Sequence, residues 1–407
     1  MSTQTKSKKP SLAVQIFIAL ALGIAAGLIF DAVGLQSFPG SYLKPFGTIF
    51  LNLLKFCVVP MVLTSIIDGV VSLQDIRKVG SIGIKTVVYY LITTACAICI
   101  GIAYALLFKG HYMLLDTTGL EYTAAESGSF MDTIVNIFPS NFLSPMVEST
   151  MLQVIVIALM LGFGIIIAGE KGQPLFNVIK SLEDVFMIIM GGIIKLTPIA
   201  VFCLIAPVVA ENGAAILGSL ALVLLTAYLG YFTHAIIVYS LACKTLGHYS
   251  PVTFLKKALP AFLFAFSSTS SIGTLPVTME CAEDMGVDKE ISSFVLPLGA
   301  TINMDGTAIY QGVCTIFIAA CYGITLTPAQ LVAVVLTATL ASIGTAGTPG
   351  AGMIMLAMVL QSVGLPVEGI ALVAGIDRIF DMGRTGINVV GDLSCCVFVN
   401  RMEKSKR

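Results

Sequence analysis

Charged side chains are scarce in this sequence. Asp, Glu, Lys and Arg make up 11% of the 407 residues, and the formal net charge is −1. Without a basic excess, the chain has no electrostatic basis for binding nucleic acid. Hydrophobic residues make up 57% of the chain, and the mean hydropathy of +0.96 lies outside the range of soluble domains. The composition therefore predicts a membrane protein.

The residues that most metal sites and hydrolases need are also few. The three histidines are too far apart in the sequence to build a transition-metal site: His111, His234 and His248. The chain has no GxSxG motif, and no histidine accompanies its serine-rich segments. An intramembrane hydrolase would need a nucleophile and a base within reach of one another. We therefore expect no enzyme and no cofactor.

A cleavable leader is not expected either. Lys6, Lys8 and Lys9 precede an apolar run from Leu12 to Phe30, which has the outline of a signal peptide. The run is too long for the apolar core of a signal peptide, and no small-x-small cleavage site follows it. It is predicted to be a retained first transmembrane helix.

The ten cysteines do not imply disulfides. Nine of them lie in apolar runs, where thiols behave as small hydrophobes, and Cys281 has polar neighbours but no obvious partner. The sequence Cys96-Ala-Ile-Cys99 formally matches a CxxC redox pair. Its place in a membrane-embedded helix favours a packing role instead.

Eight apolar segments are each long enough to cross a hydrocarbon core of about 30 Å. They are residues 12–33, 44–71, 79–108, 149–168, 185–209, 214–243, 291–320 and 370–399. Basic loop residues gather on the side of the N-terminal lysines, whereas the loop after the third segment is acidic. By the positive-inside rule, both termini are expected in the cytoplasm. The segments predict an all-α integral membrane protein that crosses the plasma membrane eight times.

Two further stretches, 251–290 and 327–368, contain apolar runs too short to span comfortably. Their centres read SSTSSIGTLP (267–276) and ASIGTAGTPGAG (341–352), so both contain Ser-Ile-Gly-Thr shortly before a proline. Such clusters are tolerated at membrane depth only where protein or a water-filled cavity satisfies the backbone. Two kinked helices would explain them, but two re-entrant hairpins of an inverted repeat are the preferred interpretation. Paired interrupted segments of this kind point to a transporter binding site.

A polar stripe occupies the last apolar segment. Its members fall at i, i+4, i+7, i+8, i+11 and i+15, which is one face of a helix: Asp377, Asp381, Arg384, Thr385, Asn388 and Asp392. Charged groups at membrane depth are costly and usually face a protein interior or a pathway. The stripe therefore predicts a binding site for a charged solute.

A second polar segment, Gly299-Ala-Thr-Ile-Asn-Met-Asp-Gly-Thr307, lies between the two interrupted stretches. Gly299 and Gly306 favour an unwound helix, which would free carbonyl groups from their i+4 partners. Carbonyls with the Asp305 carboxylate and the Asn303 amide are hard oxygen ligands that suit an alkali cation. Asp392 with Asn388 would form another such cluster. A kinked helix with a locally satisfied Asp305 is the simpler alternative.

These motifs resemble the dicarboxylate/amino acid:cation symporters, the sodium-coupled glutamate/aspartate transporter family. The resemblance rests on NMDGT (303–307), the two hairpin centres, DMGRTGINVVGD (381–392) and YYLITT (89–94), and covers essentially the whole chain. It implies a homotrimer of an elevator transporter with eight transmembrane helices and two re-entrant hairpins. A scaffold would comprise residues 1–78 and 109–213, and a transport domain 79–108 and 214–400, before a cytoplasmic tail at 401–407.

The resemblance also implies a site for an acidic amino acid. Arg384 would pair with the side-chain carboxylate of the substrate, and Asp381 would receive its amino group. The remaining binding residues would be Thr269, Ser270, Ser271, Thr307, Thr348, Pro349, Gly350, Ala351, Gly352, Thr385 and Asn388.

Three sodium sites are implied in the same way. The first would use Asp392 with carbonyls of Gly299, Asn303 and Asn388. The second would use carbonyls of Thr301, Ser342, Ile343 and Thr345. The third would use Asp305, Asn303, Thr93, Thr94 and the Tyr90 carbonyl. Sodium, the acidic amino acid and membrane lipid are thus the expected partners.

Three positions bear on the branch of the family. Archaeal members carry arginine where this chain has Thr269; here the extra arginine is Arg378, whose guanidinium is expected to reach the same region from the opposite side. Gln311 stands where potassium-antiporting animal members have glutamate, which argues against coupling of the animal kind. A proton-driven carrier and a C4-dicarboxylate carrier remain alternatives, although the latter would not need Asp381. A pure ion channel is disfavoured, because a site of both charge signs suits a zwitterion better.

Overall fold

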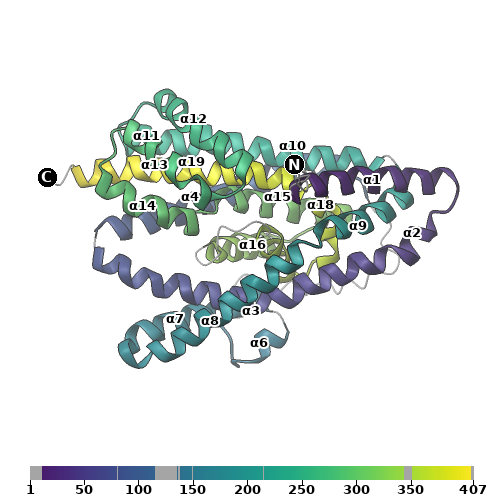
Figure 1. The fold of residues 1–407 in the computed structure, drawn as a ribbon, viewed down its shortest axis with the longest axis horizontal. Helices are drawn as coiled ribbons and strands as arrows, with labels where there is room; N and C mark the ends of the chain where they lie inside the picture. Colours follow the sequence, from purple (N-terminus) through teal and green to yellow (C-terminus); the bar gives the residue numbers. More distant parts are fainter. Residues whose placement is uncertain are drawn as a thin grey trace, which may run out of the picture.

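The computed structural model describes residues 12–79, 81–114, 135, 138–148, 150–213, 215–342 and 351–404. Within these residues all regular secondary structure is helical, and the helices form an elongated bundle (Figure 1). The prediction of an all-α protein is confirmed for this part of the chain.

The helices of the first half run in the order α1 (Leu12–Ala32), α2 (Ser37–Tyr42), α3 (Lys44–Val79), α4 (Ser81–Phe108), η1 (Lys109–His111), α6 (Ser144–Val147), α7 (Met151–Ala168), η2 (Gly169–Lys171), α8 (Gln173–Ile194) and α9 (Thr197–Asn212). The second half contains α10 (Ala215–Thr233), η3 (His234–Tyr239), α11 (Ser240–Thr245), α12 (Pro251–Ser268), α13 (Ser271–Asp284), α14 (Lys289–Ile302), α15 (Asp305–Cys321), α16 (Pro328–Ala341), α17 (Ala351–Ser362), η4 (Val367–Gly369), α18 (Ile370–Ala374) and α19 (Asp377–Lys404).

Six helical stretches of the described chain are long and apolar enough to cross a membrane, and α8 with α9 would make a seventh if that bent pair is one span. The predicted span 185–209 is wrong in its boundaries, because α8 and α9 meet at a bend of 53°. Pro198 lies in the first turn of α9, where a missing N–H is tolerated but a helix cannot continue undisturbed from before it. The polar stripe lowers the hydropathy of α19, so the count of eight spans stays a prediction.

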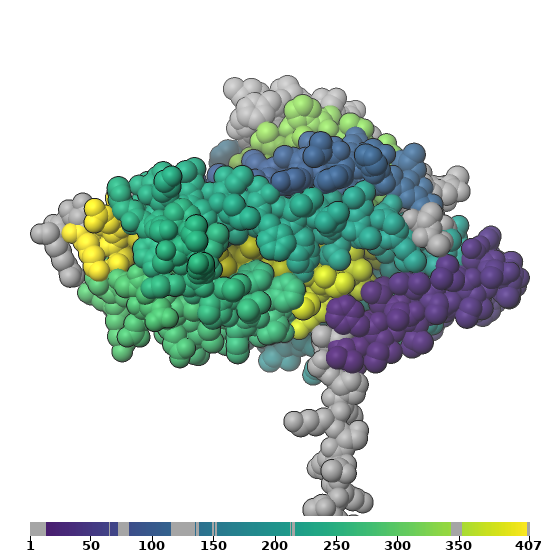
Figure 2. Space-filling view, turned by 90° about the horizontal axis from the view of Figure 1, so that it is seen from above, coloured from purple at the N-terminus to yellow at the C-terminus, as the bar shows by residue number. Residues whose placement is uncertain are grey.

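The helices pack in two groups. In the first, α1 lies along α9, and α3 packs against α7, α8 and α9. In the second, α4 packs on α15, and α19 is contacted by α10 and α12 to α15. Figure 2 shows α19 in yellow, largely covered by the green and teal helices around it. The helix with the polar stripe is therefore the centre of the second group.

The first interrupted stretch is a helical hairpin. Helices α12 and α13 pack against each other, and the chain reverses at Thr269, whose φ of +53° is left-handed. Ser270 then caps α13 by accepting a hydrogen bond from Gly273 N at 3.0 Å. A left-handed residue that ends one helix and a serine cap that begins the next explain the break.

The second interrupted stretch has the same plan in its described parts. Helices α16 and α17 pack against each other, and the connecting residues 343–350 lie outside the described residues. The predicted tip of this hairpin, including Ile343, Thr345, Thr348, Pro349 and Gly350, therefore stays a prediction.

The segment between α14 and α15 is unwound, as predicted, but at Asn303–Met304 and not at the glycines. The Gly299 carbonyl keeps its helical partner, Asn303 N, at 2.8 Å. Gly299 is needed for close packing instead, because a Cβ there would overlap the Asp392 carboxylate and the Tyr90 hydroxyl. A Cβ at Gly306 would likewise overlap the Arg384 backbone. The two glycines thus let the broken helix approach α19.

Candidate functional site

The polar stripe of α19 is buried, as its apolar surroundings predicted. All six residues are at most 7% exposed: Asp377, Asp381, Arg384, Thr385, Asn388 and Asp392. A buried charge is expensive unless it is paired, so the partners of these groups define the site.

Arg384 is held by two carboxylates of its own helix. Its Nε donates to Asp381 Oδ1 at 2.9 Å, and its Nη1 and Nη2 donate to the two oxygens of Asp377 at 3.0 and 3.3 Å. The Tyr310 ring lies 4.8 Å from the guanidinium carbon. The fork geometry that Arg384 offers Asp377 is the one that would bind a substrate carboxylate.

Asp377 was on the predicted stripe but not among the predicted binding residues. The signal was its position seven residues before Arg384, which places both on one face of the helix. Spacing alone could not show that the two side chains form a bidentate pair.

Asp381 contacts three neighbours on α19. Besides Arg384, its Oδ1 accepts a bond from Thr385 Oγ1 at 3.4 Å, and its Oδ2 lies 3.4 Å from Arg378 Nη1. The extra arginine therefore reaches the carboxylate expected to receive the substrate's amino group. This follows from their i,i+3 spacing on one helix.

The start of α17, which belongs to the second hairpin, packs against Arg384. A Cβ at Gly352 would overlap the guanidinium group of Arg384. The first turn of α17 thus lies directly against the arginine, in agreement with the prediction that this segment lines the site.

At the tip of the first hairpin, some of the polar groups are hydrogen-bonded within the hairpin itself. Thr269 and Ser271 are buried, and α13 packs on α19. The Ser270 hydroxyl caps α13, and its carbonyl accepts a bond from Thr274 Oγ1 at 2.7 Å. Ser270 therefore shapes the tip through its own hydrogen bonds.

Asn388 joins α19 to the broken helix. Its Oδ1 accepts a hydrogen bond from Gly306 N at 2.8 Å, and its Nδ2 lies 3.6 Å from the Met304 sulfur. Thr307 Oγ1 lies 3.7 Å from the same sulfur. The structure thus brings together Asn388 and Thr307, two of the predicted binding residues.

Two members of the predicted first cation cluster, Asp392 and the Asn388 carbonyl, meet at the side chain of Asn303. Its Nδ2 donates to Asp392 Oδ1 at 2.9 Å and to the Asn388 carbonyl at 2.7 Å. Its other amide atom, Oδ1, is buried and has no hydrogen-bond partner among the described residues. A buried acceptor left unpaired is costly. Beside a carboxylate, this orphaned oxygen fits the ligand set of a hard cation.

The predicted third cluster gathers at Asp305, with an unexpected composition. Thr94 Oγ1 donates to Asp305 Oδ1 at 2.6 Å, as expected, and Thr93 Oγ1 donates to the Tyr90 carbonyl at 3.2 Å. The other carboxylate oxygen, however, accepts from Tyr239 at 2.8 Å and lies 3.1 Å from Nε2 of His234. Both residues were missed by the sequence analysis.

The predicted second cluster is only partly described. The Thr301 hydroxyl donates to the Leu298 carbonyl at 2.8 Å, and the Ser342 hydroxyl donates to the Thr339 carbonyl at 2.7 Å. Ile343 and Thr345 lie outside the described residues. The cluster therefore stays a prediction.

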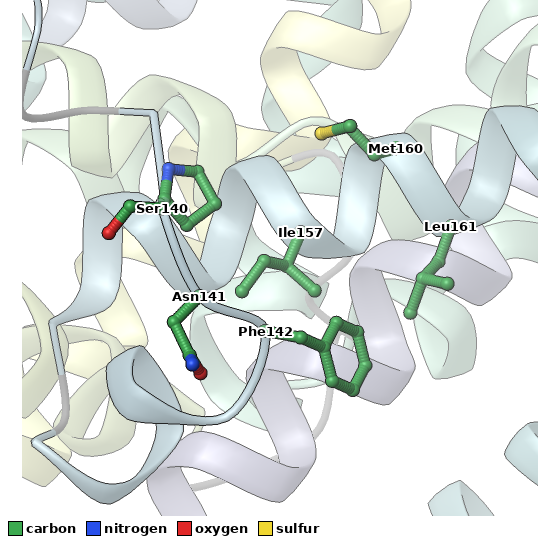
Figure 3. A pocket seen from close by; sticks show the side chains of 7 residues that line it. Ser140, Asn141, Phe142, Ile157, Met160 and Leu161 are labelled. Carbon is green, nitrogen blue, oxygen red and sulfur yellow. The ribbon is translucent and has the colours of Figure 1, made fainter.

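A pocket of about 370 Å³ lies between α7 and the loop that precedes α6 (Figure 3). Its lining residues are distant in sequence from the residues described above. It is lined by Pro139, Ser140, Asn141, Phe142, Ile157, Met160 and Leu161. None of the seven carries a charge, so the pocket offers no partner for a charged solute.

Comparisons with known proteins give a consistent result. The sequence profile of the Sodium:dicarboxylate symporter family matches residues 12–402. The chain is 35% identical to the proton/sodium-glutamate symport protein of Geobacillus stearothermophilus, over 97% of this chain and 95% of that protein. It is 33% identical to the proton/glutamate-aspartate symporter of Escherichia coli (strain K12), over 98% and 94%. It is 29% identical to the C4-dicarboxylate transport protein of Bacillus subtilis (strain 168), over 97% and 94%.

Proposed function

Because the chain belongs to the Sodium:dicarboxylate symporter family, we propose that it is a secondary active symporter that takes up glutamate or aspartate together with sodium. The family and the relatives are transporters and not enzymes. The several long apolar helices agree with a multi-pass membrane protein.

One observation carries the choice of substrate, namely the buried arrangement of Arg384 between two carboxylates. A guanidinium binds a carboxylate bidentately, whereas Asp381 suits an ammonium group. An acidic amino acid presents both charges, and a C4-dicarboxylate presents only the first. In this proposal the substrate's side-chain carboxylate takes Arg384, and Asp381 takes its amino group.

The coupling ion is proposed from the oxygen-rich clusters. Asp392, the orphaned Asn303 Oδ1 and nearby backbone carbonyls are hard ligands from α14 and α19. Such ligands suit sodium. Cation and substrate would then share α19 and the broken helix, which supports a coupling free energy between the two binding events.

The proposed architecture follows the two helix groups. A scaffold of residues 1–78 and 109–213 corresponds to the group of α1, α3 and α7 to α9, and a transport domain of 79–108 and 214–400 to the group around α19. We propose eight spans with inverted repeats, two re-entrant hairpins, cytoplasmic termini with a tail at 401–407, a homotrimer in lipid, and an elevator movement of the transport domain.

A proton-coupled carrier and a C4-dicarboxylate carrier are the alternatives. The names of the relatives in Escherichia coli and Bacillus subtilis favour the first and the second, respectively. Arg384 is compatible with both. Asp381 argues against the second, because a C4-dicarboxylate has no ammonium group for this carboxylate, whose partners in the structure are Arg384 and Arg378.

Equilibrium binding separates the substrate classes. Labelled aspartate bound to the purified protein in saturating sodium would be displaced by unlabelled glutamate, succinate or serine. We expect aspartate and glutamate to compete at far lower concentrations than succinate and serine. Succinate that competes as well as aspartate would instead favour the C4-dicarboxylate carrier.

A further inference from the structure

Asp305 is anchored by a helical irregularity that no predicted motif contains. Helix α10 continues through η3, a π-helical segment from His234 to Tyr239, into α11. The first and last residues of this segment both contact Asp305 Oδ2. Both side chains are buried, and His234 is 0% exposed.

The π-helix explains how two residues five apart reach one oxygen. In an α-helix with 3.6 residues per turn, side chains at i and i+5 point about 140° apart. A π-helix closes i→i+5 hydrogen bonds and so returns residue i+5 to the same face. Such segments are uncommon in proteins, but those that occur often lie at functional sites. Here the irregularity presents an imidazole and a phenol to one carboxylate.

Close packing at Gly391 of α19 supports the same arrangement. A Cβ at Gly391 would lie 2.5 Å from the Tyr239 hydroxyl and 2.6 Å from Asn303 Nδ2. Glycine at this position of α19 lets Tyr239 pass the helix and reach Asp305. The surroundings of Asp305 and of Asp392 therefore meet at Gly391.

The two oxygens of the Asp305 carboxylate have different numbers of contacts among the described residues. A carboxylate offers about four acceptor positions. Oδ2 uses two of them, on His234 and Tyr239, whereas Oδ1 uses one, on Thr94. The remaining position thus lies on the oxygen that faces α4, the helix with the other predicted ligands of this cluster.

We propose that His234 is a positioning residue for the cation site at Asp305, and that it acts together with Tyr239. The two donors clamp Oδ2, keep the buried carboxylate in one orientation and leave Oδ1 with the Thr94 hydroxyl to bind the cation. This proposal rests on the proposed sodium coupling and adds a determinant of sodium affinity from η3. Hydrogen-bond partners behind a metal ligand commonly change metal affinity 10- to 100-fold when removed.

Sodium titrations of aspartate binding test the proposal. His234→Ala and Tyr239→Phe should each raise the half-saturating sodium concentration on the order of tenfold. His234→Gln keeps an N–H donor of similar reach and should stay within about threefold of the wild type. Aspartate affinity in saturating sodium should be unchanged in all three, because Arg384 and Asp381 are untouched. The matched control is Tyr231→Phe, which removes a buried hydroxyl that no group in the described part of the chain hydrogen-bonds.

The outcomes are distinct. Wild-type sodium dependence in His234→Ala and Tyr239→Phe would overturn the proposal, and so would a His234→Gln variant as impaired as His234→Ala. If His234→Ala does not fold, Tyr239→Phe and His234→Gln still decide the matter, since neither leaves a large cavity. Sodium-independent aspartate binding in the wild type would instead contradict the proposed function itself.

Discussion

In the proposed site, substrate choice depends on Arg384. In the structure its guanidinium is bound by Asp377 and Asp381 and is 3% exposed. A substrate carboxylate that binds there must exchange with, or join, carboxylates already present. The arginine therefore has a partner in the absence of substrate, which keeps a buried charge from standing alone.

Replacement of Arg384 by cysteine should change specificity without abolishing binding. The lost bidentate pair should cost acidic substrates about 2–5 kcal/mol, because their carboxylate would be left unpaired in a water-poor site. Asp381 would still hold an amino group, so small neutral amino acids such as serine should gain relative to aspartate. Competition binding on Arg384→Cys measures this ratio. If aspartate keeps its wild-type margin over serine, Arg384 does not bind the side-chain carboxylate.

Asp392 should control sodium dependence. Its oxygen bonds to Asn303, whose own Oδ1 is orphaned, and we assign both to a cation. Asp392→Asn removes the charge at constant shape, so the half-saturating sodium concentration should rise about tenfold or more. Aspartate affinity should fall at limiting sodium through linkage. Sodium titrations of aspartate binding provide the measurement, and an unchanged titration would refute the assignment.

The residue pattern of α19 predicted which side chains share a face, and the structure confirms it. The pattern did not predict Asp377 as the bidentate partner of Arg384, nor His234 and Tyr239 as partners of Asp305. Helical spacing specifies direction within one element, whereas these contacts depend on rotamers and on a π-helical segment that an apolar sequence does not reveal. His234 lies 71 residues before Asp305, so no short sequence motif joins the two.

At the scale of elements, the closeness of α17 to α19 makes its own prediction. Gly352→Ala should push the Arg384 guanidinium aside and lower the affinity for aspartate, because the arginine would no longer be placed for a substrate carboxylate. The melting temperature should fall as well, since overpacking commonly costs a folded protein about 1–3 kcal/mol and the displaced group belongs to a buried ion pair. Aspartate binding and melting temperature should be measured together. The matched control is Gly191→Ala in α8, where a Cβ would meet nothing within 4 Å.

Equal losses of aspartate affinity in both glycine variants would contradict this contact, as would wild-type affinity in Gly352→Ala.

The hairpins themselves were predictable from their Ser/Thr/Gly/Pro centres. The position of the break in α14–α15 was not, because the glycines that suggested it serve close helix packing and the chain unwinds three residues before Gly306.

At the scale of the whole molecule, an ion pair among the described residues joins the first helix group to the segment before α19. Lys55 of α3 lies 2.6 Å from Glu368 in η4, and the side chains are 31% and 47% exposed. Burial alone would raise the pKa of the Glu368 carboxyl, but the hydrogen bond and charge of Lys55 outweigh it and hold that pKa below its usual value. A pair this exposed contributes at most about 1 kcal/mol.

The sign of its pH dependence follows from the lowered pKa. The stabilisation is fully present above the unfolded glutamate pKa of about 4.3 and is lost as pH falls through the lower folded value. The melting temperature of the wild type should therefore exceed that of Glu368→Gln by a small, constant amount from about pH 6 to 8, and the difference should vanish in acid. Lys55→Gln is the control, because it removes the other partner of the ion pair. Its melting temperature should lie below that of the wild type by the same small amount. A gap between wild type and Glu368→Gln that grows in acid would contradict the ion pair.

The order of the long apolar helices followed largely from hydropathy, since long apolar runs need a membrane. The α8–α9 bend did not, because a run of apolar residues reads the same whether the helix continues or turns. Packing of the two helix groups against each other depends on many weak contacts spread over several helices, which no short motif encodes.

The central claim is that sodium drives uptake of an acidic amino acid. Purified protein in liposomes should be offered labelled aspartate under an imposed inward sodium gradient at equal pH, and separately under an imposed proton gradient without sodium. We predict concentrative uptake with the sodium gradient and no more than equilibration with the proton gradient. Concentrative uptake driven by protons in the absence of sodium would contradict the account.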